Sequence, residues 1–205
     1  MVSYLQPKLI RTLKGHAHRI NTLALNTEFA MRKISENPPG DGEDLSSLAQ
    51  KTYSEAREDT GEVLVSGSDD CTLFMWHPET SSKPISRLTG HQQPVNHLVF
   101  SPDRRFLASA SFDKKIKIWN GKNGKLLATL HGHVGAVYQV AWAPDSRFIA
   151  SGSKDSTVKV WEVGPKASTK ALHTLPGHAD EVFALDWSPS GSHVASGSKD
   201  RILKM

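Results

Sequence analysis

Histidine, serine and aspartate recur in this chain in an order that could serve nucleophilic catalysis. Glycine-histidine pairs begin at Gly15, Gly90, Gly132 and Gly177, and each is followed by a serine and then by an aspartate. These three residue types form the triads of hydrolases, in which histidine takes the proton of the serine nucleophile. A catalytic site needs one accessible copy, whereas this set returns along the whole chain. Repetition therefore favours an architectural role, and no enzyme activity is expected.

The repeated residues define a period and a set of strands. The histidines step by 75, 42 and 45 residues, and the aspartates at 70, 113, 155 and 200 step by 43, 42 and 45. After each histidine come apolar residues at a spacing of two, a turn containing Ser-Pro or Ala-Pro in three of the units, and further alternating runs. This pattern predicts antiparallel strands with one buried face. A fourth strand, such as 126–130 or 171–175, completes each small sheet.

A period of about 40 to 45 residues with this punctuation resembles the blades of WD40 propellers. The expected fold is all-β, a partial WD40 propeller of about three and a half to four four-stranded blades. The resemblance implies that each blade holds a hydrogen-bonded tetrad, which ties the loop before the first strand to the third strand. The structural tetrad residues are His16, Ser66, Asp70 and Trp76; His91, Ser109, Asp113 and Trp119; His133, Ser151, Asp155 and Trp161; and His178, Ser196 and Asp200.

The repeats divide residues 1–205 into a first unit at 8–25 and 63–80, a second at 81–120, a third at 121–163 and a fourth at 164–205. Residues 8–13 are predicted to form the last strand of a further blade, and the fourth unit stops where the others place tryptophan. We therefore expect an internal or C-terminal portion of a larger propeller, or a shortened gene product. Open sheet edges would favour association.

An acidic insertion at 26–62 lengthens the first repeat. It holds nine acidic and four basic residues. Apolar side chains at Leu45, Leu48, Ala49, Tyr53 and Ala56 fall at helical spacing, which predicts a short amphipathic helix. Its apolar stripe either packs on its own blade or binds a partner.

The repeats carry the basic residues, because the whole chain has a formal net charge of +4 despite the acidic insertion. Residues 114–144 contain five lysines and no acid, and the strand lysines are expected to point outward. Lys114, Lys115, Lys117, Lys122 and Lys125 could follow the phosphates of a nucleic acid. The alternative is a solvated strand edge.

The sequence shows no pattern typical of disulfides, metal sites or membrane segments. Cys71 is the sole cysteine, which excludes an intramolecular disulfide framework. The histidines and the cysteine show no metal-ligand spacing, and no run has the length of a membrane span or secretory signal. We expect no metal, no cofactor, no small-molecule substrate and no membrane.

Longer stretches are similar to the Notchless family of ribosome-assembly proteins. They are RTLKGHAHRINTLAL before the insertion, VSGSDDCTLFMW, LASASFDKKIKIWNGKNGKLLATLHGHVGAVYQVAW and LPGHADEVFALDWSP. The resemblance implies a nuclear, mainly nucleolar scaffold that binds precursors of the large (60S) ribosomal subunit, with pre-60S proteins and rRNA as partners. In that family an N-terminal ubiquitin-like domain engages the AAA ATPase midasin, which we do not expect to bind through the residues present here.

Two other classes remain open. WD40 substrate receptors of ubiquitin ligases often carry an arginine three residues beyond a Trp-Asp pair, and the stretches after Trp76, Trp119 and Trp161 do not fit that pattern. A signalling scaffold, including one in the Notch pathway, is the other alternative.

Partners are expected on the face formed by the loops before each first strand and the turns before each third strand. The WD40 pattern places there the fifth residue after each histidine, the residue before each aspartate, and two neighbours. Aromatic and charged residues mixed on a rigid rim suit an interface, although Phe112, Tyr138 and Phe183 could instead serve packing between blades. The predicted partner-binding residues are Asn21, Asn96, Tyr138 and Phe183; Asp69, Phe112, Lys154 and Lys199; and Arg19 and Glu181.

Overall fold

The computed structural model describes residues 9–30, 45–58, 61–164 and 168–205 of the protein. Its strands form four antiparallel sheets, each in the order of the sequence. The first blade contains β1 (Ile20–Leu25), β2 (Leu64–Ser68), β3 (Leu73–Trp76) and β4 (Ser86–Leu88). The second contains β5 (Val95–Phe100), β6 (Phe106–Ser111), β7 (Lys115–Asn120) and β8 (Leu126–His131).

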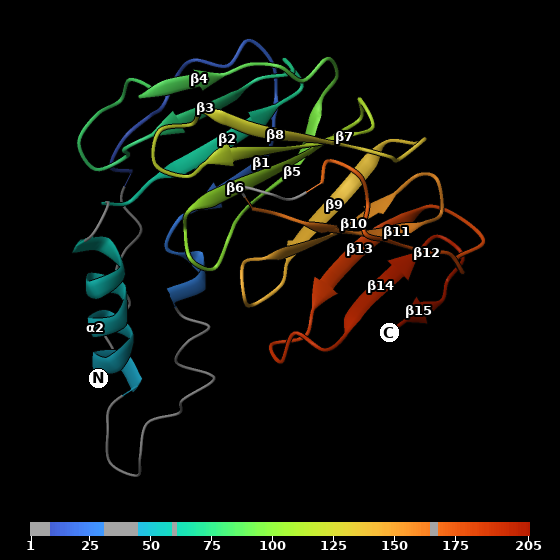
Figure 1. Ribbon diagram of the computed structural model, residues 1–205. Coiled ribbons are helices and arrows are strands. Elements are labelled where there is room, and N and C mark those ends of the chain that lie inside the picture. The colour runs from blue at the N-terminus through green and yellow to red at the C-terminus, as the bar shows by residue number, and fades with distance from the viewer. Residues whose placement is uncertain (1–8, 31–44, 59–60, 165–167) are drawn as a thin grey trace.

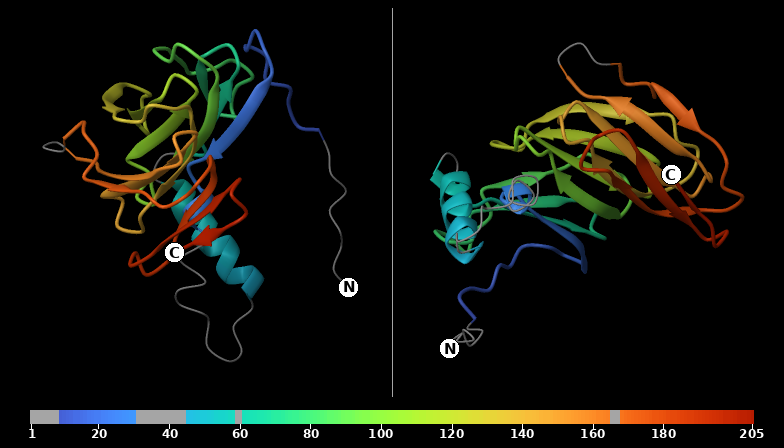
Figure 2. Two further views of the ribbon diagram at one scale, coloured as in Figure 1. Left: turned by 90° about the vertical axis from the view of Figure 1, so that its right-hand side faces the viewer. Right: turned by 90° about the horizontal axis from the view of Figure 1, so that it is seen from below.

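The third blade contains β9 (Val137–Trp142), β10 (Phe148–Ser153), β11 (Val158–Glu162) and β12 (His173–Leu175), so its last strand begins two residues later than predicted. The fourth sheet has three described strands, β13 (Val182–Trp187), β14 (Val194–Ser198) and β15 (Leu203–Lys204). The predicted all-β architecture is confirmed. The first strands β1, β5, β9 and β13 contact one another in that order, and the sheets fan out from them (Figure 1; Figure 2).

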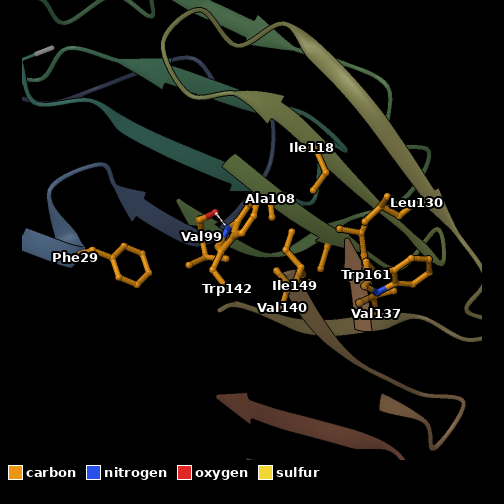
Figure 3. Close-up of a cluster of buried hydrophobic side chains, with 12 residues drawn as sticks. Phe29, Val99, Ala108, Ile118, Leu130, Val137, Val140, Trp142, Ile149 and Trp161 are labelled. Atoms are coloured by element: carbon orange, nitrogen blue, oxygen red, sulfur yellow. Dashed lines mark hydrogen bonds between the residues drawn. The ribbon is translucent and has the colours of Figure 1, made fainter. Parts of the chain in front are cut away.

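Apolar side chains between neighbouring blades hold the sheets together. Between the second and third blades, Ile116 and Ile118 of β7 pack with Ile149 of β10 and with Trp161 of β11 (Figure 3). Similar clusters lie at the other two boundaries. Trp76, Trp119 and Trp161 are among the largest fully buried side chains. Because β-branched and aromatic residues fill a pleated surface well, these strands stack face against face.

The insertion contains a 3-10 helix, η1 (Glu28–Ala30), and an α-helix, α2 (Leu45–Glu58), which stands beside the sheets in Figure 1. Phe29 of η1 is buried in the cluster between the second and third blades, a contact that the sequence did not indicate. The Tyr53 hydroxyl donates to the Glu62 carboxylate just before β2. Leu48 and Tyr53 are half-buried, whereas residues 31–44 and 59–60 and the side chains of Leu45, Ala49 and Ala56 lie outside the described part.

The strand predicted at 8–13 is wrong for residues 9–13, which are not in a strand, and Lys8 lies outside the described residues. A strand needs a hydrogen-bonding neighbour. Within the described chain, however, the first sheet ends at β1 and β4, and residues 9–13 belong to no sheet.

The expectation that the strand lysines point outward is wrong for Lys117, whose exposed fraction is 6%. Its side chain passes Gly90, and its Nζ donates to Thr129 Oγ1 on β8. Alternation along β7 does place Lys117 on the other face of the strand from Ile116 and Ile118. That second face is also covered by protein. The five lysines of 114–144 do not form one patch either. Lys114 precedes β7, whereas Lys122 and Lys125 follow its far end.

Among the described residues, no helix is both long and apolar enough to cross a membrane.

Candidate interaction face

Each predicted tetrad comes together as a chain of hydrogen bonds. In the third blade, Trp161 Nε1 donates to Ser151 Oγ at 2.8 Å, and Ser151 Oγ lies 2.8 Å from His133 Nε2. His133 Nδ1 lies 2.8 Å from Asp155 Oδ2, which also accepts the Val134 backbone N–H. The chain of bonds joins β11, β10, the loop before β9 and the turn before β11.

The other blades repeat this geometry. The first and second have the full set of four residues, and the fourth has the histidine, serine and aspartate without a tryptophan among its described residues. The remaining members are His16, Ser66, Asp70 and Trp76; His91, Ser109, Asp113 and Trp119; and His178, Ser196 and Asp200.

Protonation in the tetrads follows from burial and hydrogen bonding. Burial acts to raise the pKa of Asp155, but hydrogen bonds from Thr157, His133 and Val134 outweigh it and lower that pKa to about 2. Burial lowers the pKa of His133, although Asp155 opposes the shift. At neutral pH the pair is therefore a carboxylate that accepts a hydrogen bond from the Nδ1–H of a neutral imidazole.

The serine, histidine and aspartate have the connectivity of a catalytic triad, but their surroundings assign them to structure. Ser151 is fully buried, and its Oγ already accepts the Trp161 indole N–H. A nucleophile must reach its substrate, whereas this hydroxyl is closed off from solvent and hydrogen-bonded within its own blade. The tetrad instead satisfies buried polar groups and holds the entry loop in place.

These entry loops and the turns between the second and third strands form one end of the sheets, which we call the entry face. In all four blades the residue before the tetrad aspartate donates its backbone N–H to the carbonyl of the third residue after the histidine. The bonds run from Asp69 to Arg19, from Phe112 to Pro94, from Lys154 to Ala136 and from Lys199 to Glu181, at 2.9–3.1 Å. Loop and turn are thus one hydrogen-bonded unit.

A β-bulge places the fifth residue after each histidine on the same face. In the third blade, Val137 pairs with Ser153 and Gln139 with Gly152, which leaves Tyr138 without a partner residue across the ladder. Asn21, Asn96 and Phe183 likewise have no partner residue across their ladders. A bulge turns a side chain out of the regular alternation. No residue type in the sequence directly marks these bulges, although a small residue stands opposite each one: Gly67, Ala110, Gly152 and Gly197.

Side chains on the entry face also connect neighbouring blades. Asn21 Nδ2 donates to the Val95 carbonyl of the second blade, and Asn96 Nδ2 donates to the Tyr138 carbonyl of the third. The Tyr138 hydroxyl donates to Glu181 Oε2 of the fourth at 2.9 Å. These bonds fix the order and spacing of the blades along the face.

Aromatic rings form a row across three blades. Phe112 meets Tyr138 edge to face with ring centroids 6.0 Å apart, and Tyr138 stacks on Phe183 at 4.6 Å. Phe112 and Phe183 are nevertheless 37% and 46% exposed. The sequence left open whether these aromatic residues pack between blades or face solvent. The same side chains do both. We call Phe112, Tyr138 and Phe183 the aromatic row.

Charged side chains surround the row. Lys154 Nζ lies 4.0 Å from Glu181 Oε1, and Lys199 Nζ lies 3.7 Å from Asp180 Oδ2. At the first blade, Asp69 accepts from Arg19 and Asn21. The structure thus brings all ten predicted partner-binding residues to the entry face.

A second serine in each repeat was missed as a supporting residue. Ser111 Oγ accepts the Asp113 backbone N–H and donates to the Gln93 carbonyl of the entry loop. Ser68 and Ser198 make the equivalent pairs of bonds, and Ser153 accepts from the Asp155 backbone N–H. Their invariant place two residues before the aspartate was the available signal. Among the described residues, no group of histidine, cysteine, aspartate or glutamate side chains could hold a metal ion.

Comparison with protein families gives a match to the model described as "WD domain, G-beta repeat". It covers residues 58–77, 82–120, 124–162 and 169–205, and so includes part of every repeat. The matched segments make up more than half of the chain.

Several curated proteins are similar to parts of the chain. "Ribosome assembly protein 4" of Saccharomyces cerevisiae is 45% identical over 131 residues, which are 60% of this chain and 25% of that protein. "Notchless protein homolog" of Arabidopsis thaliana is 54% identical over 79 residues, 38% of this chain and 17% of that protein. "Protein Notchless" of Drosophila melanogaster is 48% identical over 104 residues, 46% of this chain and 21% of that protein.

The chain therefore spans at most a quarter of the length of these relatives. Their names confirm the resemblance to the Notchless ribosome-assembly proteins. The repeated sheets and the matched repeats lead to one assignment: the chain belongs to the WD40 repeat family.

Proposed function

We propose that this protein is a non-enzymatic WD40 scaffold in ribosome assembly, and that it binds precursors of the large (60S) subunit through the entry face. Relatives named for ribosome assembly support the process. The observation that supports the surface is the bulge at the same position of every blade. Each of the four bulges lies next to an entry loop held by a hydrogen-bonded histidine, serine and aspartate, and each places a side chain on the entry face.

The partners in this proposal are pre-60S proteins and rRNA, and the location is the nucleus, mainly the nucleolus, where such particles mature. Midasin is not included among the partners of these residues. A role in the Notch pathway or as a ubiquitin-ligase receptor remains a separate hypothesis, for which the entry face offers no particular support.

Affinity capture tests the proposal. The tagged chain is expressed in eukaryotic cells, and captured material is separated on a sucrose gradient and probed for large-subunit precursors. We expect Phe112→Ala with Phe183→Ala to reduce the captured precursors severalfold, because exposed aromatic residues commonly carry interface energy. The matched control is Lys122→Ala with Lys125→Ala, at the opposite end of β7. Equal loss in both variants would contradict the proposed surface, and capture of ligase subunits or membrane receptors instead of precursors would contradict the proposed process.

A further inference from the structure

We propose that the aromatic row is a stacking platform for single-stranded RNA. This inference rests on the proposed function and names the chemistry that the entry face recognises. Three rings from successive blades lie in contact, and Phe112 and Phe183 remain partly open to solvent. Every base has a flat π-face, so aromatic side chains bind successive bases of a single strand with little regard for sequence.

The row is held in place before any ligand arrives. The backbone N–H of Phe112 donates to the Pro94 carbonyl, and the Tyr138 hydroxyl donates to Glu181. Phe183 is a bulge residue that stacks on Tyr138. Because these rings are already ordered, RNA would not have to supply the entropy cost of arranging them.

The charges that reach solvent beside the row are mainly positive. The side chains of Lys154 and Lys199 are both 59% exposed. Lys114 and Arg201, in the turns of the second and fourth blades, are exposed and take part in none of the ion pairs found within the described chain. Lysine and arginine beside stacking rings provide the contacts that a phosphate backbone needs.

The acids of this face are largely engaged. The tetrad carboxylates of Asp113, Asp155 and Asp200 are almost fully buried and point into hydrogen bonds below the surface. Glu181 accepts from Tyr138 and lies near Lys154, and Asp180 lies near Lys199. An approaching polyanion therefore meets the cation tips first.

Single-stranded RNA fits the row better than the other polyanions. A duplex keeps its bases inside the helix and cannot offer them to protein rings. An acidic peptide would pair with the lysines but has no repeated flat groups for three aromatic side chains. The structure thus favours a ligand that combines both chemistries at short spacing.

The test uses the 205-residue chain and a fluorescein-labelled oligouridine of about eight nucleotides, a length within the range of known single-strand sites. Fluorescence anisotropy at several salt concentrations gives the dissociation constant and its salt dependence. We expect binding that Phe183→Ala weakens about tenfold, because one stacking contact is lost. Phe183→Trp keeps an aromatic face and should retain the affinity, and circular dichroism checks that both variants remain folded.

The charge contribution has its own matched pair of variants. Lys154→Gln with Lys199→Gln should reduce the slope of log affinity against log salt by about 1.4, since each phosphate contact on a single strand contributes about 0.7. Lys122→Gln with Lys125→Gln removes the same charge at the far end of β7 and should leave the slope unchanged. Equal slopes in the two variants would overturn the inference.

Two further outcomes separate this inference from the proposed function. If oligouridine does not bind at low salt, or if polyglutamate binds in its place, the RNA inference is wrong. Should Phe112→Ala with Phe183→Ala still reduce capture of ribosomal precursors in that case, the proposed function stands with a protein partner. If oligouridine binds as expected but precursors are never captured, the proposed function is wrong and the RNA site remains.

Discussion

The Tyr138 hydroxyl donates a 2.9 Å hydrogen bond to Glu181 Oε2 and so joins the third blade to the fourth on the entry face. Burial and the neighbouring Glu181 carboxylate raise the pKa of Tyr138 to about 12. The hydroxyl therefore remains a donor at neutral pH. One residue thus supplies a ring to the aromatic row and a bond between blades.

This bond predicts a measurable coupling. Tyr138→Phe keeps the ring and removes the donor, so we expect a loss of about 0.5–1.5 kcal/mol in the free energy of unfolding. Glu181→Gln should weaken the same bond. In a double-mutant cycle followed by urea denaturation, the two changes should be non-additive; strictly additive losses would show that the bond contributes nothing to the fold.

The tetrads should act through stability alone. Trp161→Ala removes a fully buried side chain from between two blades and should cost about 3–5 kcal/mol. Asp155→Ala leaves the buried His133 without its acceptor and should cost about 1–3 kcal/mol. Urea denaturation measures both. A tetrad variant that lost binding or any catalytic activity while its denaturation curve stayed unchanged would refute the structural assignment.

Acid should destabilise the fold over a defined range. The folded pKa of His133 lies below its ordinary 6.5, so the unfolded chain binds more protons and stability falls as the pH drops below about 6.5. The folded pKa of Asp155 is about 2 against an ordinary 3.8, so its contribution is present above about pH 4 and is lost towards pH 2.

Both shifts have the same sign, and stability should rise with pH across this range. The free energy of unfolding measured from pH 7 to pH 2 checks the prediction. Asp155→Asn cannot ionise and should flatten the part of the curve below pH 4. An identical pH dependence in wild type and variant would contradict the role of the carboxylate.

The small residue opposite a bulge should resist enlargement. A Cβ on Gly152 would lie 2.9 Å from Val182 Cγ1 and 3.2 Å from the Val182 carbonyl oxygen, across the boundary between the third and fourth blades. Gly152→Ala should therefore cost about 1–3 kcal/mol. Gly164→Ala is the matched control, because among the described residues no atom beyond its chain neighbours lies within 4 Å of the position of an added Cβ. Thermal melts that shift equally for both variants would argue against close packing at the bulge.

The sequence predicted what depends on residue type and period. The tetrad residues recur as the same residue types at the same positions of each repeat. Counting along the chain was therefore sufficient to place His133, Asp155 and Trp161. The bulges were not visible because the four residues that form them, two asparagines, a tyrosine and a phenylalanine, are not of one type. Only the small residues across the ladder mark them.

The errors also have physical causes. Alternation put Lys117 opposite the apolar face of β7 but could not show that Gly90 passes over its side chain. Residues 9–13 have strand-like composition, yet composition cannot supply the neighbouring strand that hydrogen bonding requires. Phe29 was unassigned because a buried residue within an insertion follows no repeat.

The most direct measurement of the central claim is site-specific crosslinking. A photoreactive amino acid replaces Phe183 on the entry face or, as a control, Lys122 at the opposite end of β7, and each tagged chain is irradiated in eukaryotic cells. We predict that position 183 crosslinks to proteins or RNA of large-subunit precursors and that position 122 does not. Equal crosslinking at the two positions, or crosslinks at position 122 alone, would contradict the account of the entry face as the binding surface.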